Sequence, residues 1–283
     1  MQADFEYCSR LVRDADRDRY LATLFAPAAQ RGALNTLYAF NIEIARVREK
    51  AREPMPGEIR LQWWREVLAG ERDGEAAAHP VAAALRETLA RCNIAGDRLI
   101  ALIDAHTFDL YDEPMATLDD LENYAGKTQG ALFAMAAEIL GRPGAAGTAL
   151  TRHAGIAYSI AGILRALPVH AARRQLYLPL ELLERNGVNR EDIFARQAEI
   201  PLRTALAELR AHARRHLAGA RAELDVAPTE ILPALLPAAT VGPALRRMER
   251  PSYAPFEFDQ LPGWRRQWWL WRAARDPSRI FMT

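Results

Sequence analysis

The sequence predicts an all-α protein, a single-domain helical bundle. Apolar residues recur at helical spacing along most of the chain, whereas β-branched residues are sparse and alternation of period two is never sustained. Proline and glycine clusters separate the helical segments, and no linker-like or repeated stretch divides the chain. With 283 residues, 50% of them hydrophobic, the chain can bury a large core. We therefore predict one domain over residues 1–283.

The helices of the first half follow from this spacing and from its breaks. A short apolar pattern ends before Pro27, and a longer one begins at Ala28. The Pro/Gly cluster at residues 53–57 is predicted to terminate that second helix. The ranges predicted in this half are 20–25, 28–53, 58–70, 80–92 and 96–110.

The second half continues the helical pattern to the end of the chain. Thr117 is followed by Asp119 and Asp120, which is the pattern of an N-cap residue before an acidic first turn. Residues 148–167 are apolar and rich in small side chains, which predicts a central helix ending before Pro168. The other predicted ranges are 117–140, 180–185, 190–197, 201–224, 228–247 and 264–275. The predicted core or cavity residues are Leu37, Phe40, Ile44, Phe133, Ile156, Ile160 and Ile163.

Composition excludes some classes of function and predicts a compartment. Lys plus Arg number 37 against 36 Asp plus Glu, so no excess of positive charge indicates a nucleic-acid partner. The two cysteines, Cys8 and Cys92, have no metal-ligand spacing, which favours a reducing compartment. The charged first residues do not resemble a signal peptide, and no uncharged apolar run of about 18 residues predicts a bilayer-spanning helix. We expect a cytoplasmic protein.

Three stretches of the chain carry a family resemblance. They are Ala39-Phe40 in LNTLYAFNIEIARVRE, Trp63-Trp64 in IRLQWWREVL, and GILRALPVHAARRQLYLP at residues 162–179. With HPVAAALRETLARCNI and LENYAGKTQGALF between them, they resemble the squalene/phytoene synthase family over roughly residues 17–225. The resemblance implies an isoprenoid-synthase bundle around a central cavity. It also implies enzymes that join two prenyl diphosphates held by Mg²⁺ on two aspartate-rich motifs.

The first of these motifs reads AFxxxADDxxDE in the family. In this chain Ala45 and Arg46 stand at the two adjacent aspartates, and only the last acid is kept, as Glu49. A single carboxylate beside Arg46 and Arg48 is not expected to recruit Mg²⁺, which needs several oxygen ligands.

The second motif reads NILRDxxED in the family, before an arginine-rich stretch and YLP. Here Ala166 and His170 stand at the two key aspartates, and Val169 stands at the remaining acid. The rest of the motif still matches, at Arg165, Arg173, Arg174, Tyr177, Leu178 and Pro179. The resemblance thus implies a scaffold that lacks every metal-facing acid of the second motif and keeps only Glu49 at the first, and no catalytic residue is assigned.

Both segments also resemble one branch of the family, the mitochondrial complex I assembly factor 6. Its pattern, AFNxExA and then LRAxPxHxxRR before LP, fits this chain at both motifs. The resemblance implies a non-catalytic binding or assembly factor with no cofactor, whose partner is a respiratory complex I subunit or assembly intermediate. Two alternatives are open: a Mg²⁺-dependent head-to-head prenyl transferase, and a carrier that holds an isoprenoid or anionic lipid in the cavity.

The residues left at the motifs predict a cationic site in place of a metal site. The candidate ligands for a phosphate-bearing lipid or an acidic peptide are Arg46, Arg165, His170, Arg173, Arg174 and Tyr177. Alternatively, Arg46 and Arg165 form ion pairs with structural acids, of which the candidates are Glu43, Glu49 and Asp109.

No metal ligand is assigned elsewhere in the chain. The histidines His106, His153 and His212 are interpreted as having no partners at metal spacing. Three acids near the middle of the chain, Asp104, Asp109 and Asp112, predict either a substitute metal face or solvated surface charge.

The last predicted helix is rich in tryptophan and arginine. Trp264, Trp268 and Trp271 recur at i, i+4 and i+7, which suits a helix packed on its own bundle. Aromatic residues beside arginines also suit a membrane interface or a partner surface. In that case the protein would lie at the inner face of the cytoplasmic membrane.

Overall fold

A computed structural model describes residues 2–51, 53–111, 113–141, 149–197, 200–257 and 262–283. Throughout these residues the chain forms helices, turns and loops without a strand, which confirms the all-α prediction. Contacts group the chain into two compact units. Unit 1 is Met1–Tyr111, Ala131–Thr148 and Ala227–Pro237, and unit 2 is Asp112–Gly130, Ala149–Val226 and Ala238–Thr283. The prediction of a single domain stays a prediction.

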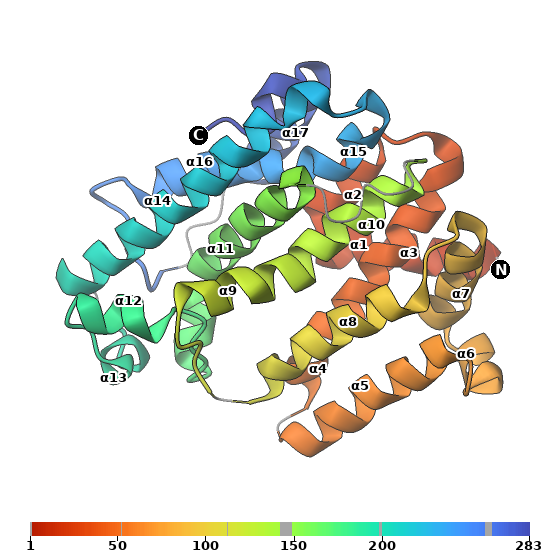
Figure 1. The fold of residues 1–283 in the computed structure, drawn as a ribbon, viewed down its shortest axis with the longest axis horizontal. Coiled ribbons are helices and arrows are strands. Elements are labelled where there is room, and N and C mark those ends of the chain that lie inside the picture. The colour runs from red at the N-terminus through yellow and green to blue at the C-terminus, as the bar shows by residue number, and fades with distance from the viewer. Residues whose placement is uncertain (1, 52, 112, 142–148, 198–199, 258–261) are drawn as a thin grey trace. The chain divides into compact units, whose positions relative to one another are not determined.

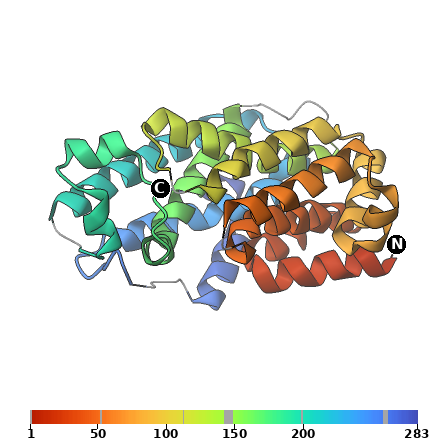
Figure 2. The same cartoon turned by 90° about the horizontal axis from the view of Figure 1, so that it is seen from below.

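Unit 1 is a helical bundle whose inner helix is α3. α1 packs against α3 and α7, α3 also contacts α10, and α5 lies along α8 (Figure 2). Trp64, Phe40 and Leu37 are among its fully or nearly fully buried side chains. The helices are α1 (Gln2–Ala15), α2 (Arg17–Thr23), α3 (Ala28–Ala45), α4 (Val47–Lys50), α5 (Pro54–Ala69), α6 (Asp73–Ala78), α7 (Pro80–Cys92), α8 (Gly96–Thr107), η1 (Phe108–Leu110), α10 (Ala131–Ile139), η4 (Thr229–Ile231) and α15 (Leu232–Leu235).

The chain between residues 45 and 58 departs from the prediction. α3 ends at Ala45, because Arg46 takes up φ −90° and ψ 1° outside the helical region, and α4 follows as a separate turn. The Pro/Gly cluster begins α5 instead of merely ending the preceding helix. Pro54 stands in its first turn, where the missing N–H costs no hydrogen bond and the ring presets φ.

Two unit 1 helices were not predicted, α1 and α6. α1 buries Cys8 and Val12, one turn apart, and half-buries Phe5 and Leu11. These residues recur at helical spacing, so a periodic signal for α1 was present in the sequence and was missed; α1 packs on α3 and α7.

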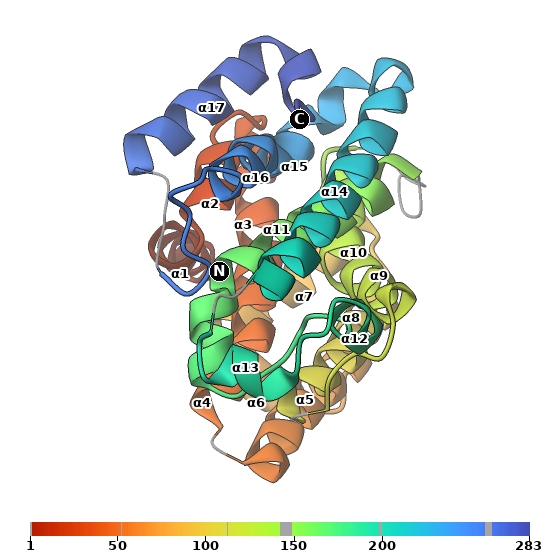
Figure 3. The same cartoon turned by 90° about the vertical axis from the view of Figure 1, so that its left-hand side faces the viewer.

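Unit 2 is organised around two long helices, α11 and α14, which run side by side (Figure 1). α9 and the π-helical turn η2 pack on α11, and α16 contacts both long helices. The short helices α12 and α13 lead from the end of α11 to the start of α14 (Figure 3). The helices are α9 (Leu118–Ala125), η2 (Gly126–Gly130), α11 (Ala149–Ala172), α12 (Leu180–Arg185), α13 (Arg190–Phe194), α14 (Ile200–Ala222), η3 (Leu224–Val226), α16 (Val241–Met248), α17 (Gly263–Arg275) and η6 (Pro277–Arg279). A further 3₁₀ turn, η5 (Leu236–Thr240), crosses the boundary between the units.

α11 is the central helix that the sequence predicts, and it continues past Pro168 to Ala172. By length and composition it could cross a membrane, but 67% of its apolar window is buried inside the protein. That burial is what a core helix of a globular bundle shows.

The predicted core residues are confirmed in both units. Leu37, Phe40, Ile44 and Phe133 are at most 3% exposed in unit 1. The three isoleucines of α11 are at most 8% exposed in unit 2; they are Ile156, Ile160 and Ile163. The central cavity implied by the family resemblance stays a prediction.

Candidate functional site

The second motif lies at the C-terminal end of α11 in unit 2. α11 ends because Arg174 adopts a left-handed conformation with φ 54°, the conformation of a helix C-cap. The backbone N–H of Gln175 then reaches back to the carbonyl oxygen of His170, 2.9 Å away. Glycine is the usual residue at such a position, so an arginine there holds the turn at some cost in backbone strain.

The side chains of this motif separate into two groups. The His170 ring packs against Tyr177, with centroids 4.6 Å apart, and Tyr177 lies beside Tyr124. Arg174 turns instead toward α13, where its guanidinium lies 3.0 Å from Glu191 and 4.7 Å from the Phe194 ring centre. The structure therefore brings His170 and Tyr177 together and directs Arg174 elsewhere. Arg165 and Ala166 are half-buried on the last turns of α11, and Arg173 is exposed.

The first motif lies in unit 1, where α3 gives way to α4. Ala45 and Glu49 are exposed and Arg46 is half-buried at the break between the helices. The Lys50 ammonium lies 3.3 Å from the Glu43 carboxylate. The two motifs thus belong to different units, and the convergence of their arginines on one anion stays a prediction.

Two mid-chain acids have specific partners in unit 1. Asp104 forms an ion pair with Arg65 at 2.8 Å. Asp109 is 8% exposed, and its carboxylate lies 2.6 Å from Nδ1 of His106. The interpretation of Asp109 as solvated surface charge is therefore wrong, because a helix-end carboxylate here is buried against a histidine. Asp112 lies outside the described residues.

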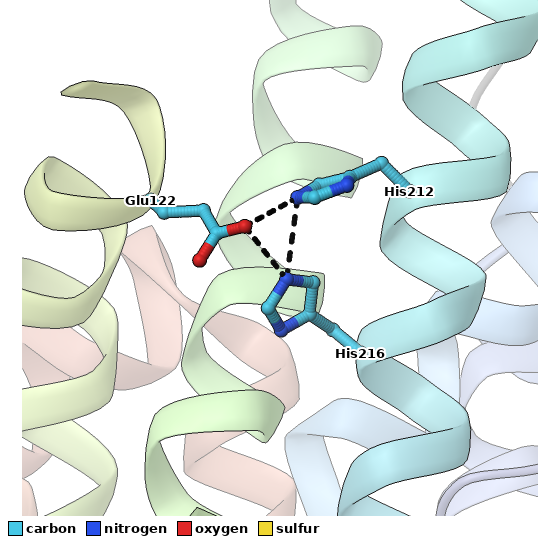
Figure 4. A group of neighbouring side chains, drawn as sticks. All are labelled: Glu122, His212 and His216. Carbon is cyan, nitrogen blue, oxygen red and sulfur yellow. Dashed lines mark hydrogen bonds and ion pairs between the residues drawn. The ribbon is translucent and has the colours of Figure 1, made fainter. Parts of the chain in front are cut away.

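Unit 2 contains a cluster of titratable side chains that sequence reasoning missed (Figure 4). Nε2 of His212 lies 2.8 Å from Oε1 of Glu122, and Nε2 of His216 lies 3.2 Å from the same oxygen. The two Nε2 atoms are 3.2 Å apart. The three groups have the number and proximity of metal ligands. The interpretation that His212 lacks partners at metal spacing is therefore wrong.

His153 also has a partner in this cluster. Its Nδ1 lies 2.9 Å from Nδ1 of His216. A signal was present in the sequence, since His212 and His216 are spaced i, i+4 and therefore share one face of a helix. No local sequence pattern could have indicated Glu122, because this residue lies 90 residues away from His212 in the chain (212 − 122 = 90).

α17 presents its aromatic residues to solvent. Trp264, Trp268 and Trp271 are 65%, 49% and 39% exposed, whereas Leu270 and Ala273 are buried. Trp268 stacks on Trp271 at 5.1 Å between centroids. The interpretation that these three tryptophans pack on the bundle is wrong, because the apolar anchors of the helix lie on a different face.

Because these tryptophans are exposed, the interpretation of α17 that remains is a surface that contacts a membrane or a partner protein. Arginines lie over the rings, for example Arg275 at 4.2 Å from the Trp271 centre and Arg265 at 5.2 Å from that of Trp264. Rings that combine apolar faces with cationic neighbours suit the headgroup region of an anionic bilayer.

Truncation of α17 tests this surface. The full chain is expected to float with anionic liposomes, whereas a chain ending at Pro262 is expected to remain in the soluble fraction. Because α17 also buries Leu270 and Ala273, a full-length variant with Trp264, Trp268 and Trp271 changed to Gln serves as the folded control and is expected to lose flotation too. Equal flotation of all three proteins would exclude a membrane role for the tryptophans.

The family assignment follows from comparison with known proteins. The model of the squalene/phytoene synthase family matches residues 12–272, which is most of the chain. The chain belongs to this family. This match confirms the predicted resemblance to the family. The helical bundle described above is the fold of this family member.

Among curated proteins, this squalene/phytoene synthase family member is similar to complex I assembly factors and to presqualene diphosphate synthases. It is 31% identical over 250 residues to the complex I assembly factor 6 of Mus musculus, covering 88% of this chain and 75% of that protein. The human protein of the same description is 30% identical over 250 residues. The chain is also 28% identical over 217 residues to a presqualene diphosphate synthase of Rhodopseudomonas palustris, covering 76% of this chain and 77% of that one.

Solved structures of the family have the same fold. The squalene synthase HpnC from Alicyclobacillus acidocaldarius aligns with a TM-score of 0.76 at 24% identity, covering 90% of this chain and 96% of that one. A dehydrosqualene synthase in complex with a ligand aligns with a TM-score of 0.84 at 19% identity, covering 98% and 96%. At such identities the likeness shows the fold alone, because one fold supports many functions.

Proposed function

We propose that this squalene/phytoene synthase relative is a non-catalytic binding or assembly factor for respiratory complex I. The observation that carries the proposal is the identity of 30–31% over 250 residues with the mammalian complex I assembly factors 6. The similarity extends over both motif segments and most of unit 1 and unit 2, so it concerns the whole fold and not one element.

The residues at the motif positions support a role without diphosphate chemistry. Ala45 and Ala166 carry no ligand atom, and Arg46 repels a cation. The ring of His170 packs on Tyr177. Ionising a prenyl diphosphate requires a counter-charge on the departing group, which Mg²⁺ bound to carboxylates supplies in such chemistry. Glu49 is the one acid kept of those that the family resemblance places at these positions.

The α17 surface supports action close to a membrane. Its exposed tryptophans and arginines offer an amphipathic contact to the inner face of the cytoplasmic membrane or to a membrane-bound assembly intermediate. A soluble bundle that docks there could hold a complex I subunit without turning over a substrate.

Deletion of the gene in the organism that encodes the chain tests this function. NADH-driven, complex I-specific respiration is expected to fall, with less assembled complex I on native gels. Succinate-driven respiration is the control and is expected to be unchanged. Complementation with the wild-type chain should restore complex I. Normal complex I in the deletion strain would contradict the proposal.

A prenyl transferase is the second candidate, favoured by the similarity to the presqualene diphosphate synthase. We expect no Mg²⁺-dependent release of pyrophosphate from farnesyl or geranylgeranyl diphosphate above a protein-free control. Mass spectrometry of the reaction and of the recovered protein separates the outcomes. A head-to-head product would establish the enzyme, whereas an unchanged isoprenoid bound to the protein would indicate lipid carriage.

A further inference from the structure

We propose that Glu122, His212 and His216 form a binding site for a divalent first-row transition metal, with Zn²⁺ as the first candidate. The three side chains come from two helices of unit 2, α9 and α14, and their ligand atoms all lie within 4.8 Å of one another (Figure 4). His212 and His216 are 7% and 6% exposed, so the nitrogen ligands are removed from bulk water.

The size of the cluster fits a tetrahedral ion. An ion with Zn–N and Zn–O bonds of about 2.0–2.1 Å has its ligand atoms about 3.3 Å from one another. The three ligand–ligand distances here are 2.8, 3.2 and 3.2 Å, close to one face of such a tetrahedron. Two imidazoles and one carboxylate are the ligand set of several three-ligand zinc sites, which leave a fourth position for water or another ligand.

Without a metal, either position of the ring proton on His216 leaves an unfavourable contact in the cluster. A guanidinium only donates, so Arg215, 2.7 Å from Nδ1 of His212, makes that nitrogen an acceptor and places the proton of His212 on Nε2. If Nε2 of His216 also carries a proton, two N–H groups meet at 3.2 Å. If it does not, its lone pair faces the oxygen of Glu122 at 3.2 Å. A cation among the three atoms removes this conflict, because every ligand then presents a lone pair.

Surrounding side chains orient two of the ligands. The Arg152 guanidinium lies 3.3 Å from Oε2 of Glu122, which leaves Oε1 directed at the histidines. With a metal on Nε2, the Nδ1–H of His216 can donate to Nδ1 of His153, 2.9 Å away. In metal-bound histidines the N–H of the second ring nitrogen commonly donates to an acceptor in this way, which fixes the ring.

Arg215 is the group that a metal would displace. Binding at Nε2 of His212 transfers the ring proton to Nδ1, which then no longer accepts from the guanidinium. Arg215 is exposed and can swing into solvent. A pocket of about 150 Å³ lined by His212 and Arg215 gives an ion access from this side. Imidazole ligands favour Zn²⁺ and its neighbours over Mg²⁺, which prefers oxygen, so this site differs in chemistry from the aspartate-rich motifs of the family.

Calorimetric titration of the full, chelator-stripped chain with ZnCl₂ tests the proposal. We expect one Zn²⁺ per chain at the high-affinity step. Glu122→Gln, which keeps size and polarity, and His216→Asn, which keeps a polar side chain, are each expected to weaken binding at least tenfold. Arg215→Ala is expected to tighten it severalfold, because the competing donor is removed. Co²⁺ in the same site should give the intense visible absorption of a tetrahedral centre.

His170→Ala is the matched control, because it removes a histidine of unit 2 outside the cluster, and its Zn²⁺ affinity is expected to equal that of the wild type. Circular dichroism of every variant establishes that it is folded, and Arg215→Ala alters only an exposed side chain. No binding by the wild-type chain would overturn the proposal. So would equal affinity in the wild type, Glu122→Gln and Arg215→Ala, since the ion would then be bound elsewhere.

Discussion

Replacing Gly155 with alanine is expected to destabilise unit 2 by about 3 kcal/mol, at the upper end of what overpacking costs. A Cβ atom at this position in α11 would lie 2.3 Å from the backbone N and Cα of Gly130 in η2. Backbone atoms cannot rotate away as a flexible side chain does, so α11 and the π-helical turn must separate. The gain in helix propensity from glycine to alanine is at most about 1 kcal/mol and does not offset the clash.

Gly162→Ala provides the matched control, because Gly162 lies in the same helix with nothing within 4 Å of its added Cβ. This variant is expected to be as stable as the wild type, or more stable by up to about 1 kcal/mol. Urea unfolding followed by circular dichroism measures both variants. If Gly155→Ala were as stable as Gly162→Ala, the close approach of α11 to η2 would be refuted.

Acidification of the metal-free chain is expected to remove about 2–3 kcal/mol of stability between pH 7 and pH 4.5 through His216 alone. Burial lowers the pKa of His216 to about 4, and the nearby carboxylate of Glu122 only partly opposes this shift. In the unfolded chain the same imidazole has its ordinary pKa of about 6.5. Between these values the unfolded chain binds a proton that the folded chain does not, so stability falls as the pH is lowered through this window.

His216 titrates among other charged and titratable groups, which the experiment has to separate. Glu122 on α9, His153 and Arg152 on α11, and His212 on α14 all belong to the cluster or contact it. Denaturant unfolding at several pH values should show a steeper loss for the wild type than for His216→Gln, in which the titrating group is absent. Identical slopes would mean that His216 does not carry the effect.

Much of the helical architecture could be predicted because its signals are local. The range predicted as 80–92 is observed as Pro80–Cys92, and 180–185 as Leu180–Arg185, since proline or a cap residue marks each start. The errors lie where a local signal has two meanings. Pro54 can end one helix or begin the next, and Pro168 is tolerated within α11 although it removes a donor.

The sequence by itself determined the class of this protein: an all-α member of the squalene/phytoene synthase family, with Ala45, Arg46, Ala166 and His170 predicted at the motif positions. Helical period suffices for the fold class, whereas the family came from the resemblance of the motif segments; both signals lie in short stretches of the chain. Only the tertiary structure decided that Glu122 meets His212 and His216, and that the tryptophans of α17 face solvent. Contacts between distant segments depend on how helices pack against one another, and the periodicity of one helix does not specify its neighbour.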